Sequence, residues 1–280
     1  NLTIDGNTFN NGSYGMYFYG SSNASFYNKN LLFANNTLNN IYSYGIYSYG
    51  TDSFRIENNA FNIAVSSSTQ YGVYTTSGGH ANIIGNRVSI QTTGSGYGIY
   101  SFTSGSSSSR NACFNNMVVV PNSNSNSRGI YMSSSYWDIY HNSVRTSGSS
   151  TSTSYAAIYT SGTSNDLQNN IAQKDGPGYA AYGTGSSFSH NNNVFHTLGS
   201  SPTNFTLDAT ESIADPQFNS TTDLYITVNS DAYNSGAALA AIQFDIDSNA
   251  RNAVTPDIGA SEYDLPSRNT NISARSVSYT

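Results

Sequence analysis

The sequence predicts an all-β chain that winds into a solenoid of short strands. Two short signatures, one centred on asparagine and one on tyrosine, alternate along the first two thirds of the chain and recur about every 27 residues. The segments that carry them are too short for helices, and stretches rich in serine, glycine and asparagine separate them. Only 9% of the 280 residues are charged, so the chain does not have the composition of a charged disordered protein. Short strands, variable loops and this period are typical of a β-solenoid.

The asparagine signature predicts buried columns and an amide ladder. Apolar residues lie three and five positions before the asparagine, as Ile56 and Phe54 do before Asn59. A step of two between buried positions is that of a strand with one buried face. Stacked coils would place the asparagines over one another, and each amide could bond the next at a buried bend. The asparagines in this register are Asn7, Asn36, Asn59, Asn86, Asn116, Asn142, Asn170 and Asn193.

The tyrosine signature predicts an outward aromatic column. It reads glycine, apolar residue, tyrosine, as in Gly72-Val73-Tyr74, and alanine replaces the glycine before Tyr159 and Tyr182. Because the apolar residue should face the core, alternation points the tyrosine outward. Stacked rings alone would stabilise neighbouring strands, but an outward strip could also bind sugar rings or another protein. The candidate ligand-binding residues are Tyr47, Tyr74, Tyr100, Tyr131 and Tyr159, and a second series precedes the glycine at Tyr14, Tyr44, Tyr71, Tyr97 and Tyr179.

These repeats resemble those of a known superfamily. The stretches FRIENNAF…YGVYTTSG and ANIIGNRVSIQTTGSGYGIYSFTSG are similar to repeats of the pectin-lyase-like superfamily. The resemblance covers about residues 1 to 195. It implies a single-stranded, right-handed parallel β-helix of about eight coils. That superfamily holds lyases, hydrolases, phage spikes, adhesins and inert scaffolds, so the resemblance leaves the function open.

The repeat stops after Phe195, and the residues that follow have a different character. The runs ADPQF, DIDSNAR and DIGASEY resemble the closing module of secreted β-helix proteins of Bacteroidota, which often carry surface-anchoring or type IX secretion signals. We therefore expect β-helix repeats over 1–195, a capping module over 196–264, and a linker or the start of a further domain over 265–280. We also expect the chain to be a piece of a longer protein.

The charged residues of this module allow two interpretations. The alternating oxygens of its DIDSN run could form a calcium loop, but Ser248 stands where glycine is usual and Arg251 falls inside the loop. We favour an ion-paired knot that closes the open end of the solenoid, because an uncapped coil exposes a strand edge. We therefore expect no metal site and no cofactor. The residues concerned are Asp245, Asp247, Arg251, Asp257 and Glu262.

Candidate catalytic residues are few. When the acids are compared by column, Asp138 and Asp166 occupy the same outward position in adjacent coils, which would separate them by about 5 Å. Such a pair could act on a glycosidic bond. We find no arginine or acid–base partner at the same column in neighbouring coils, so the alternative is two solvated surface acids. Cys113 belongs to an inward column and is expected to be a buried, inert thiol.

Composition excludes several classes of function. No apolar run approaches the roughly 18 residues of a membrane span, and two lysines with a pI near 4.9 offer little to nucleic acid. We expect a secreted or cell-surface protein, a non-catalytic adhesin-like scaffold that binds a polysaccharide or another surface protein. Secretion or anchoring machinery would act on segments outside this chain. The alternative is a carbohydrate-active enzyme of the same superfamily, either a polysaccharide lyase or a glycoside hydrolase.

Overall fold

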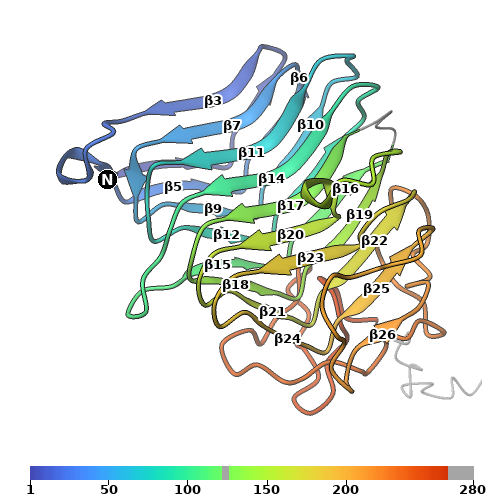
Figure 1. Ribbon diagram of the computed structural model, residues 1–280. Helices are drawn as coiled ribbons and strands as arrows, with labels where there is room; N and C mark the ends of the chain where they lie inside the picture. Colours follow the sequence, from blue (N-terminus) through green and yellow to red (C-terminus); the bar gives the residue numbers. More distant parts are fainter. Residues whose placement is uncertain (122–125, 264–280) are drawn as a thin grey trace, which may run out of the picture.

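The computed structural model describes residues 1–121 and 126–263 and confirms the predicted fold class. The chain forms an all-β parallel solenoid of about seven turns with almost no helix (Figure 1). Three long parallel sheets, here called A, B and C, run along it with eight, nine and seven strands. Because sheet C has only seven strands, the eighth asparagine signature, at Asn193, belongs to an incomplete coil. The linker expected over 265–280 lies outside the described residues.

Each complete coil contributes one strand to each long sheet. Sheet A comprises β1 (Leu2–Asp5), β5 (Leu31–Ala34), β9 (Arg55–Glu57), β12 (Asn82–Ile84), β15 (Asn111–Phe114), β18 (Trp137–Tyr140), β21 (Asp166–Gln168) and β24 (Ser189–Asn191). Sheet B comprises β2 (Thr8–Asn10), β6 (Thr37–Ile41), β10 (Ala60–Ile63), β13 (Arg87–Ile90), β16 (Met117–Val120), β19 (Ser143–Ser147), β22 (Ile171–Asp175), β25 (Val194–Thr197) and β26 (Ser212–Ile213).

Sheet C carries the tyrosine signature. It comprises β3 (Tyr14–Tyr19), β7 (Tyr44–Tyr49), β11 (Gln70–Thr76), β14 (Gly96–Phe102), β17 (Ser127–Ser133), β20 (Ile158–Ser161) and β23 (Ala181–Thr184). A small fourth sheet pairs β4 (Asn28–Lys29) with β8 (Thr51–Asp52), and two short 3-10 turns occur, η1 (Ala24–Phe26) and η2 (Thr153–Tyr155).

The interior consists of like residues stacked on like. The column three positions before the ladder asparagine pairs in register from coil to coil, and its members from Phe33 to Leu167 are at most 1% exposed. Cys113 lies in this column and is fully buried, as predicted. Burial of such side chains is the main source of stability in a fold with so few charges.

The predicted asparagine ladder forms the turn between sheets A and B. In each coil the backbone N–H and the side-chain Nδ2 of the ladder asparagine donate to Oδ1 of the next asparagine, at 2.8–3.2 Å. The residue before the asparagine adopts positive φ, for example 54° at Asn58 and 49° at His141. This conformation turns the chain and explains why the preceding residue is so often asparagine or glycine.

The glycine of the tyrosine signature is required by the corner between sheets B and C. A Cβ on Gly72 would lie 2.4 Å from Cγ1 of Val88 and 2.6 Å from the carbonyl oxygen of Gly98. The same corner accepts Ala157 later in the solenoid, where the sheet B column that holds Val144 continues as Ala172. A smaller neighbour thus makes room for the additional methyl group.

A short segment after β25 completes the last turn of the solenoid. Phe205 packs against Phe188, Phe195 and His190, with ring centroids 5.4, 5.8 and 4.3 Å away. Glu211 follows in ladder register and accepts from Nδ2 of Asn193 at 2.6 Å. A carboxylate accepts hydrogen bonds but has no donor to pass on, so the amide ladder ends at Glu211.

The charged closing residues do not cover the open end, which corrects the expectation from the sequence. The chain from about residue 214 to 263 folds back along the outer side of sheet B (orange and red in Figure 1). Ile246 and Leu224 pack on Met117 and Val119, and Ile258 packs near Ile171. The chain directly after the last coil closes the end instead: Phe205 packs against Phe188 and Phe195, and Glu211 ends the asparagine ladder.

Candidate functional site

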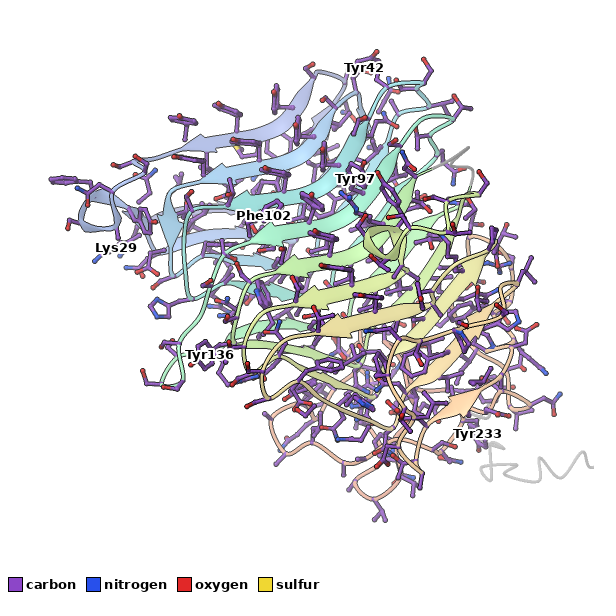
Figure 2. All side chains as sticks on the ribbon, viewed as in Figure 1. Lys29, Tyr42, Tyr97, Phe102, Tyr136 and Tyr233 are labelled. Carbon is purple, nitrogen blue, oxygen red and sulfur yellow. The ribbon has the colours of Figure 1, made fainter. Side chains whose placement is uncertain are left out.

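The outward side of sheet C carries a tyrosine face built from three columns. Column I precedes the signature glycine, column II contains the signature tyrosine, and column III lies two residues further along each strand. In Figure 2 the aromatic side chains of this face stand out from the strands of sheet C along the solenoid. Column I holds Tyr14, Tyr44, Tyr71, Tyr97 and then Arg128; column II holds Tyr17, Tyr47, Tyr74, Tyr100, Tyr131, Tyr159 and Tyr182; column III holds Tyr19, Tyr49, Thr76, Phe102, Ser133, Ser161 and Thr184.

Column II is an unbroken stack of phenol rings. Successive ring centroids lie 4.4–5.6 Å apart, and successive ring planes differ by 2–25°. The spacing follows from the distance between parallel strands, so each ring covers part of its neighbour. The candidate residues Tyr47, Tyr74, Tyr100, Tyr131 and Tyr159 all lie in this column.

Columns I and II pack in a herringbone over the first three coils, whereas at the fourth coil the ring planes of Tyr97 and Tyr100 differ by only 24°. Tyr14, Tyr44 and Tyr71 stack on one another with interplanar angles of 1° and 2°. Each of them meets its column II neighbour nearly at right angles, at 77–88°. Ring faces are therefore turned toward other rings, whereas ring edges and hydroxyl groups point to solvent. The outward strip is therefore unevenly accessible: Tyr17 is 50% exposed at one end, but Tyr131 only 9%.

Arg128 replaces a tyrosine in column I and lies within an aromatic cage. Its guanidinium carbon is 4.6 Å from the ring centroids of Tyr97, Tyr131 and Tyr155, and 5.1 Å from that of Tyr100. Nη1 donates to the hydroxyl of Tyr100 at 3.0 Å. The rings stabilise the cation through their quadrupoles. We did not single out Arg128 from the sequence, although it occupies the tyrosine position before Gly129.

Burial raises the pKa of several phenols of this face, so these hydroxyl groups stay neutral at physiological pH. Burial and, to a smaller extent, the neighbouring tyrosines raise the pKa of Tyr47 to about 12. Burial also raises the pKa of Tyr71 and of Tyr74. At Tyr100 burial raises the pKa while the charge of Arg128 opposes the rise. The face therefore presents hydroxyl groups that can both donate and accept, with the charge of Arg128 largely covered by rings.

The two candidate acids are brought together, but each already has partners. Asp138 and Asp166 are in register in adjacent strands of sheet A, and the hydroxyl of Tyr140 lies 3.0 Å from Oδ1 of Asp138 and 2.7 Å from Oδ2 of Asp166. Nε of Arg110 pairs with Asp138 at 2.6 Å; this arginine lies outside the acid column, so the comparison by column did not reveal it. Ser189 donates to Asp166 at 2.8 Å. Burial and both carboxylates raise the pKa of Tyr140.

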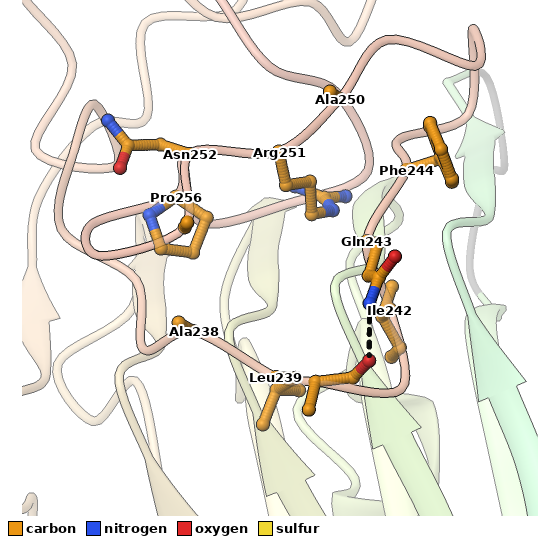
Figure 3. Close-up of a pocket in the computed structure, with 11 residues that line it drawn as sticks. Ala238, Leu239, Ile242, Gln243, Phe244, Ala250, Arg251, Asn252 and Pro256 are labelled. Carbon is orange, nitrogen blue, oxygen red and sulfur yellow. Dashed lines mark hydrogen bonds between the residues drawn. The ribbon is translucent and has the colours of Figure 1, made fainter.

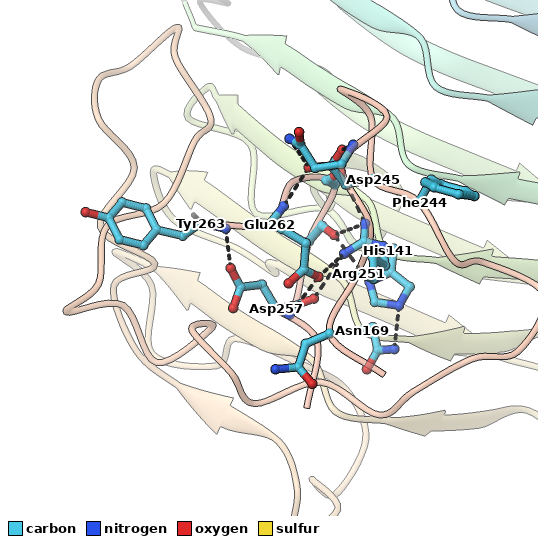
Figure 4. Close-up of polar contacts among 12 residues, drawn as sticks. His141, Asn169, Phe244, Asp245, Arg251, Asp257, Glu262 and Tyr263 are labelled. Atoms are coloured by element: carbon cyan, nitrogen blue, oxygen red, sulfur yellow. Dashed lines mark hydrogen bonds and ion pairs between the residues drawn. The ribbon is translucent and has the colours of Figure 1, made fainter. Parts of the chain in front are cut away.

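The charged residues of the closing module form a buried network (Figure 4). Arg251 pairs with Glu262 at 2.9 Å and donates to Oδ1 of Asn115 at 2.8 Å, which ties the module to the solenoid. Asp245 and Asp257 accept from backbone N–H groups of the same module, including those of Asp247 and Tyr263. In the described part of the chain, no group of three or more histidine, cysteine or acidic residues has a geometry that could hold a metal ion.

Asp247 has a different partner from the rest of the network. It pairs with Arg87 on β13 at 2.5 Å and accepts from the hydroxyl of Tyr225 at 2.7 Å. The ion-paired interpretation of these residues therefore matches their contacts, although they fasten the module to the side of the solenoid rather than to its end.

A cavity of about 430 Å³ opens in the closing module (Figure 3). Its walls are mostly apolar and include Leu239, Ile242 and Phe244. Arg251 lines it as well, but its terminal nitrogens are bound to Glu262, Asn115 and backbone carbonyls. No other residue that we singled out from the sequence lies in its wall.

Comparisons with known proteins do not indicate which class of function this chain has. No protein-family model matches the chain, and no curated protein is significantly similar to it. Within residues 1–121 and 126–263, no helix is long and apolar enough to cross a membrane.

Proposed function

We propose that this chain is a secreted or cell-surface scaffold of the adhesin type that binds an extended ligand through the tyrosine face. The observation that carries the proposal is the herringbone of columns I and II. Stacking fixes the rings, so a ligand would bind a preorganised surface and few side chains would lose freedom on binding. Tyrosine is also enriched at protein recognition surfaces, because a ring and a hydroxyl act together.

The geometry favours a ligand that lies across several coils. Hydroxyl groups recur about every 4.8 Å along the solenoid, and each offers one weak contact. A polysaccharide chain or an extended segment of another surface protein could contact many of them in sequence. Because ring faces are covered by neighbouring rings, binding would rest on hydroxyl groups and ring edges rather than on sugars stacked over open rings.

The proposed setting rests on sequence resemblance. The repeats resemble those of the pectin-lyase-like superfamily, and the DIDSNAR and DIGASEY runs resemble the closing module of secreted Bacteroidota proteins. In that setting a type IX signal outside this chain would direct export. The low charge and single cysteine are compatible with an extracellular protein.

A glycan array tests the proposal, with three classes of variant. We expect the parent to bind one or more extended glycans, and we expect Tyr74→Phe/Tyr100→Phe/Tyr131→Phe to abolish binding while preserving the stack. A single Tyr100→Ala change should cost about 1 kcal/mol. Tyr42→Phe is the matched control, because Tyr42 is 51% exposed but lies outside the face. If no glycan or protein ligand ever binds the parent, the face stabilises the fold and the binding proposal fails.

A carbohydrate-active enzyme is the second candidate, and the carboxylate pair on sheet A is the observation in its favour. Asp138 and Asp166 share the hydroxyl of Tyr140 as a common donor. Two carboxylates at such close range are the usual machinery of glycoside hydrolysis. New reducing ends or unsaturated products from an acidic polysaccharide, lost in Asp138→Asn and in Asp166→Asn, would establish this alternative.

A further inference from the structure

The tyrosine face brings oxidisable phenols into van der Waals contact over the whole length of sheet C. Column II supplies one tyrosine in each of the seven strands. The shortest centroid separations are 4.4 Å, between Tyr131 and Tyr159, and 4.6 Å, between Tyr100 and Tyr131. The reacting partners are thus held together before any reaction begins, which raises their effective concentration greatly.

We propose that this face is a site of oxidative crosslinking, where phenols of adjacent coils join as dityrosine. The co-reactant is a one-electron oxidant that draws on hydrogen peroxide, as a haem peroxidase does. Each of two tyrosines loses one electron and its phenolic proton and becomes a phenoxyl radical. The radicals form a carbon–carbon bond between their ortho positions, and the two ortho hydrogens then move to the phenolic oxygens. In total two electrons and two protons leave, and they reduce one peroxide to two waters.

The surroundings direct oxidation to these rings. Trp137 and Cys113, which are also oxidisable, are fully buried in the core and out of reach of a bulky oxidant. Exposure in column II falls from 50% at Tyr17 to 9% at Tyr131, so the phenolic proton leaves to water most readily near the N-terminal end of the column. The ortho carbons lie at the ring edges, so two stacked rings must turn from a face-to-face toward an edge-to-edge arrangement before the carbon–carbon bond can form.

Column III provides a natural contrast within the same face. Tyr19 and Tyr49 stack at 4.8 Å, but Thr76 and Phe102 follow, and neither side chain can form a phenoxyl radical. The proposal therefore predicts a crosslink at the first step of column III and none beyond it. In columns I and II it predicts crosslinks between in-register residues of neighbouring strands and between ring neighbours on one strand, such as Tyr14 and Tyr17, whose centroids are 5.1 Å apart.

A crosslink of this kind would strengthen the solenoid. Each coil contacts mainly the coils on either side, so the coils can separate one at a time during unfolding. A covalent bond between two coils closes a loop one coil long and restricts the unfolded chain. We expect the crosslinked protein to melt roughly 5 °C or more above the untreated protein.

The experiment treats dilute protein with a haem peroxidase and hydrogen peroxide. Dityrosine fluorescence reports the yield, and mass spectrometry of proteolytic peptides identifies the joined residues. We expect intramolecular links in register, led by Tyr17, which is 50% exposed, to Tyr47. Tyr131→Phe should remove the links to Tyr100 and Tyr159 but leave that between Tyr17 and Tyr47.

Two controls keep the test independent of folding and of ligand binding. Tyr159→Phe should remove the link to Tyr131 and leave the link between Tyr100 and Tyr131, and both phenylalanine variants should melt like the parent before oxidation. Tyr42→Phe, which changes an exposed tyrosine outside the face, should leave the yield unchanged. The proposal fails if links join different molecules, connect residues that are neither in register nor ring neighbours on one strand, or persist unchanged in yield in Tyr131→Phe. None of these outcomes depends on whether the face binds a glycan.

Discussion

Replacing a ladder asparagine in the middle of the solenoid tests how the turn between sheets A and B is stabilised. In Asn116→Ala the amide that links three coils is lost. Its Oδ1 accepts from the backbone N–H and Nδ2 of Asn86 at 2.9 and 3.0 Å, and its Nδ2 donates to the carbonyl of Ile83 at 2.8 Å and to Oδ1 of Asn142 at 3.0 Å. Asn116 is fully buried, so water cannot replace these partners.

The expected loss of stability follows from the hydrogen bonds that Asn116 makes. The N–H of Asn86 is left buried without an acceptor, which costs about 1–3 kcal/mol, and each other lost hydrogen bond contributes about 1 kcal/mol. Since Nδ2 of Asn86 keeps its bonds to the carbonyls of Ile56 and Ile84, it is not orphaned. The free energy of unfolding should therefore fall by about 3–5 kcal/mol in Asn116→Ala.

The chain offers a matched control in a second, exposed amide ladder. Nδ2 of Asn62 donates to Oδ1 of Asn39 at 2.9 Å on the outer surface of sheet B. Because water can satisfy both groups, Asn62→Ala should lower stability by less than about 0.5 kcal/mol. Urea unfolding followed by fluorescence of Trp137, the single tryptophan, measures both variants. Equal losses in the two variants would refute the argument that burial makes the inner ladder important.

Four further predictions concern buried groups. Burial lowers the pKa of Lys174 to about 8, so the unfolded chain binds more protons than the folded chain between pH 8 and 10.5. The free energy of unfolding should therefore rise as the pH increases through that window. Lys174→Met should remove this rise and increase the free energy of unfolding at pH 7 by about 3 kcal/mol, measured by urea unfolding. Gly98→Ala places a methyl group 2.2 Å from a valine side chain and 2.6 Å from a carbonyl oxygen, and its melting curve should show a loss of about 1–3 kcal/mol. Glu262→Gln leaves the charge of Arg251 buried without its partner and should lower the free energy of unfolding by about 3–5 kcal/mol. A free energy of unfolding close to that of the parent would show that the pair is dispensable. Finally, burial raises the pKa of the Cys113 thiol, so a thiol reagent should label it only as fast as the chain unfolds.

Much of the candidate site could be predicted from the sequence, because columns in a solenoid follow the repeat. The series of Tyr74, Tyr100 and Tyr131 was visible from spacing alone, and so was the pairing of Asp138 with Asp166. Ring orientation was not visible, since it depends on how two columns pack against each other. The salt bridge from Arg110 was missed because that arginine lies outside the acid column and reaches it from the preceding coil.

The sequence by itself determined the coil period, the inward and outward columns and the asparagine ladder. These properties depend on strand alternation and on like residues stacking at the strand spacing, both of which are local or strictly periodic. Only the tertiary structure decided that the closing module lies along sheet B, that Glu211 ends the ladder and that Arg128 sits among tyrosines. These contacts join residues that no shared period relates, so they depend on loop paths and side-chain packing that only the complete fold fixes.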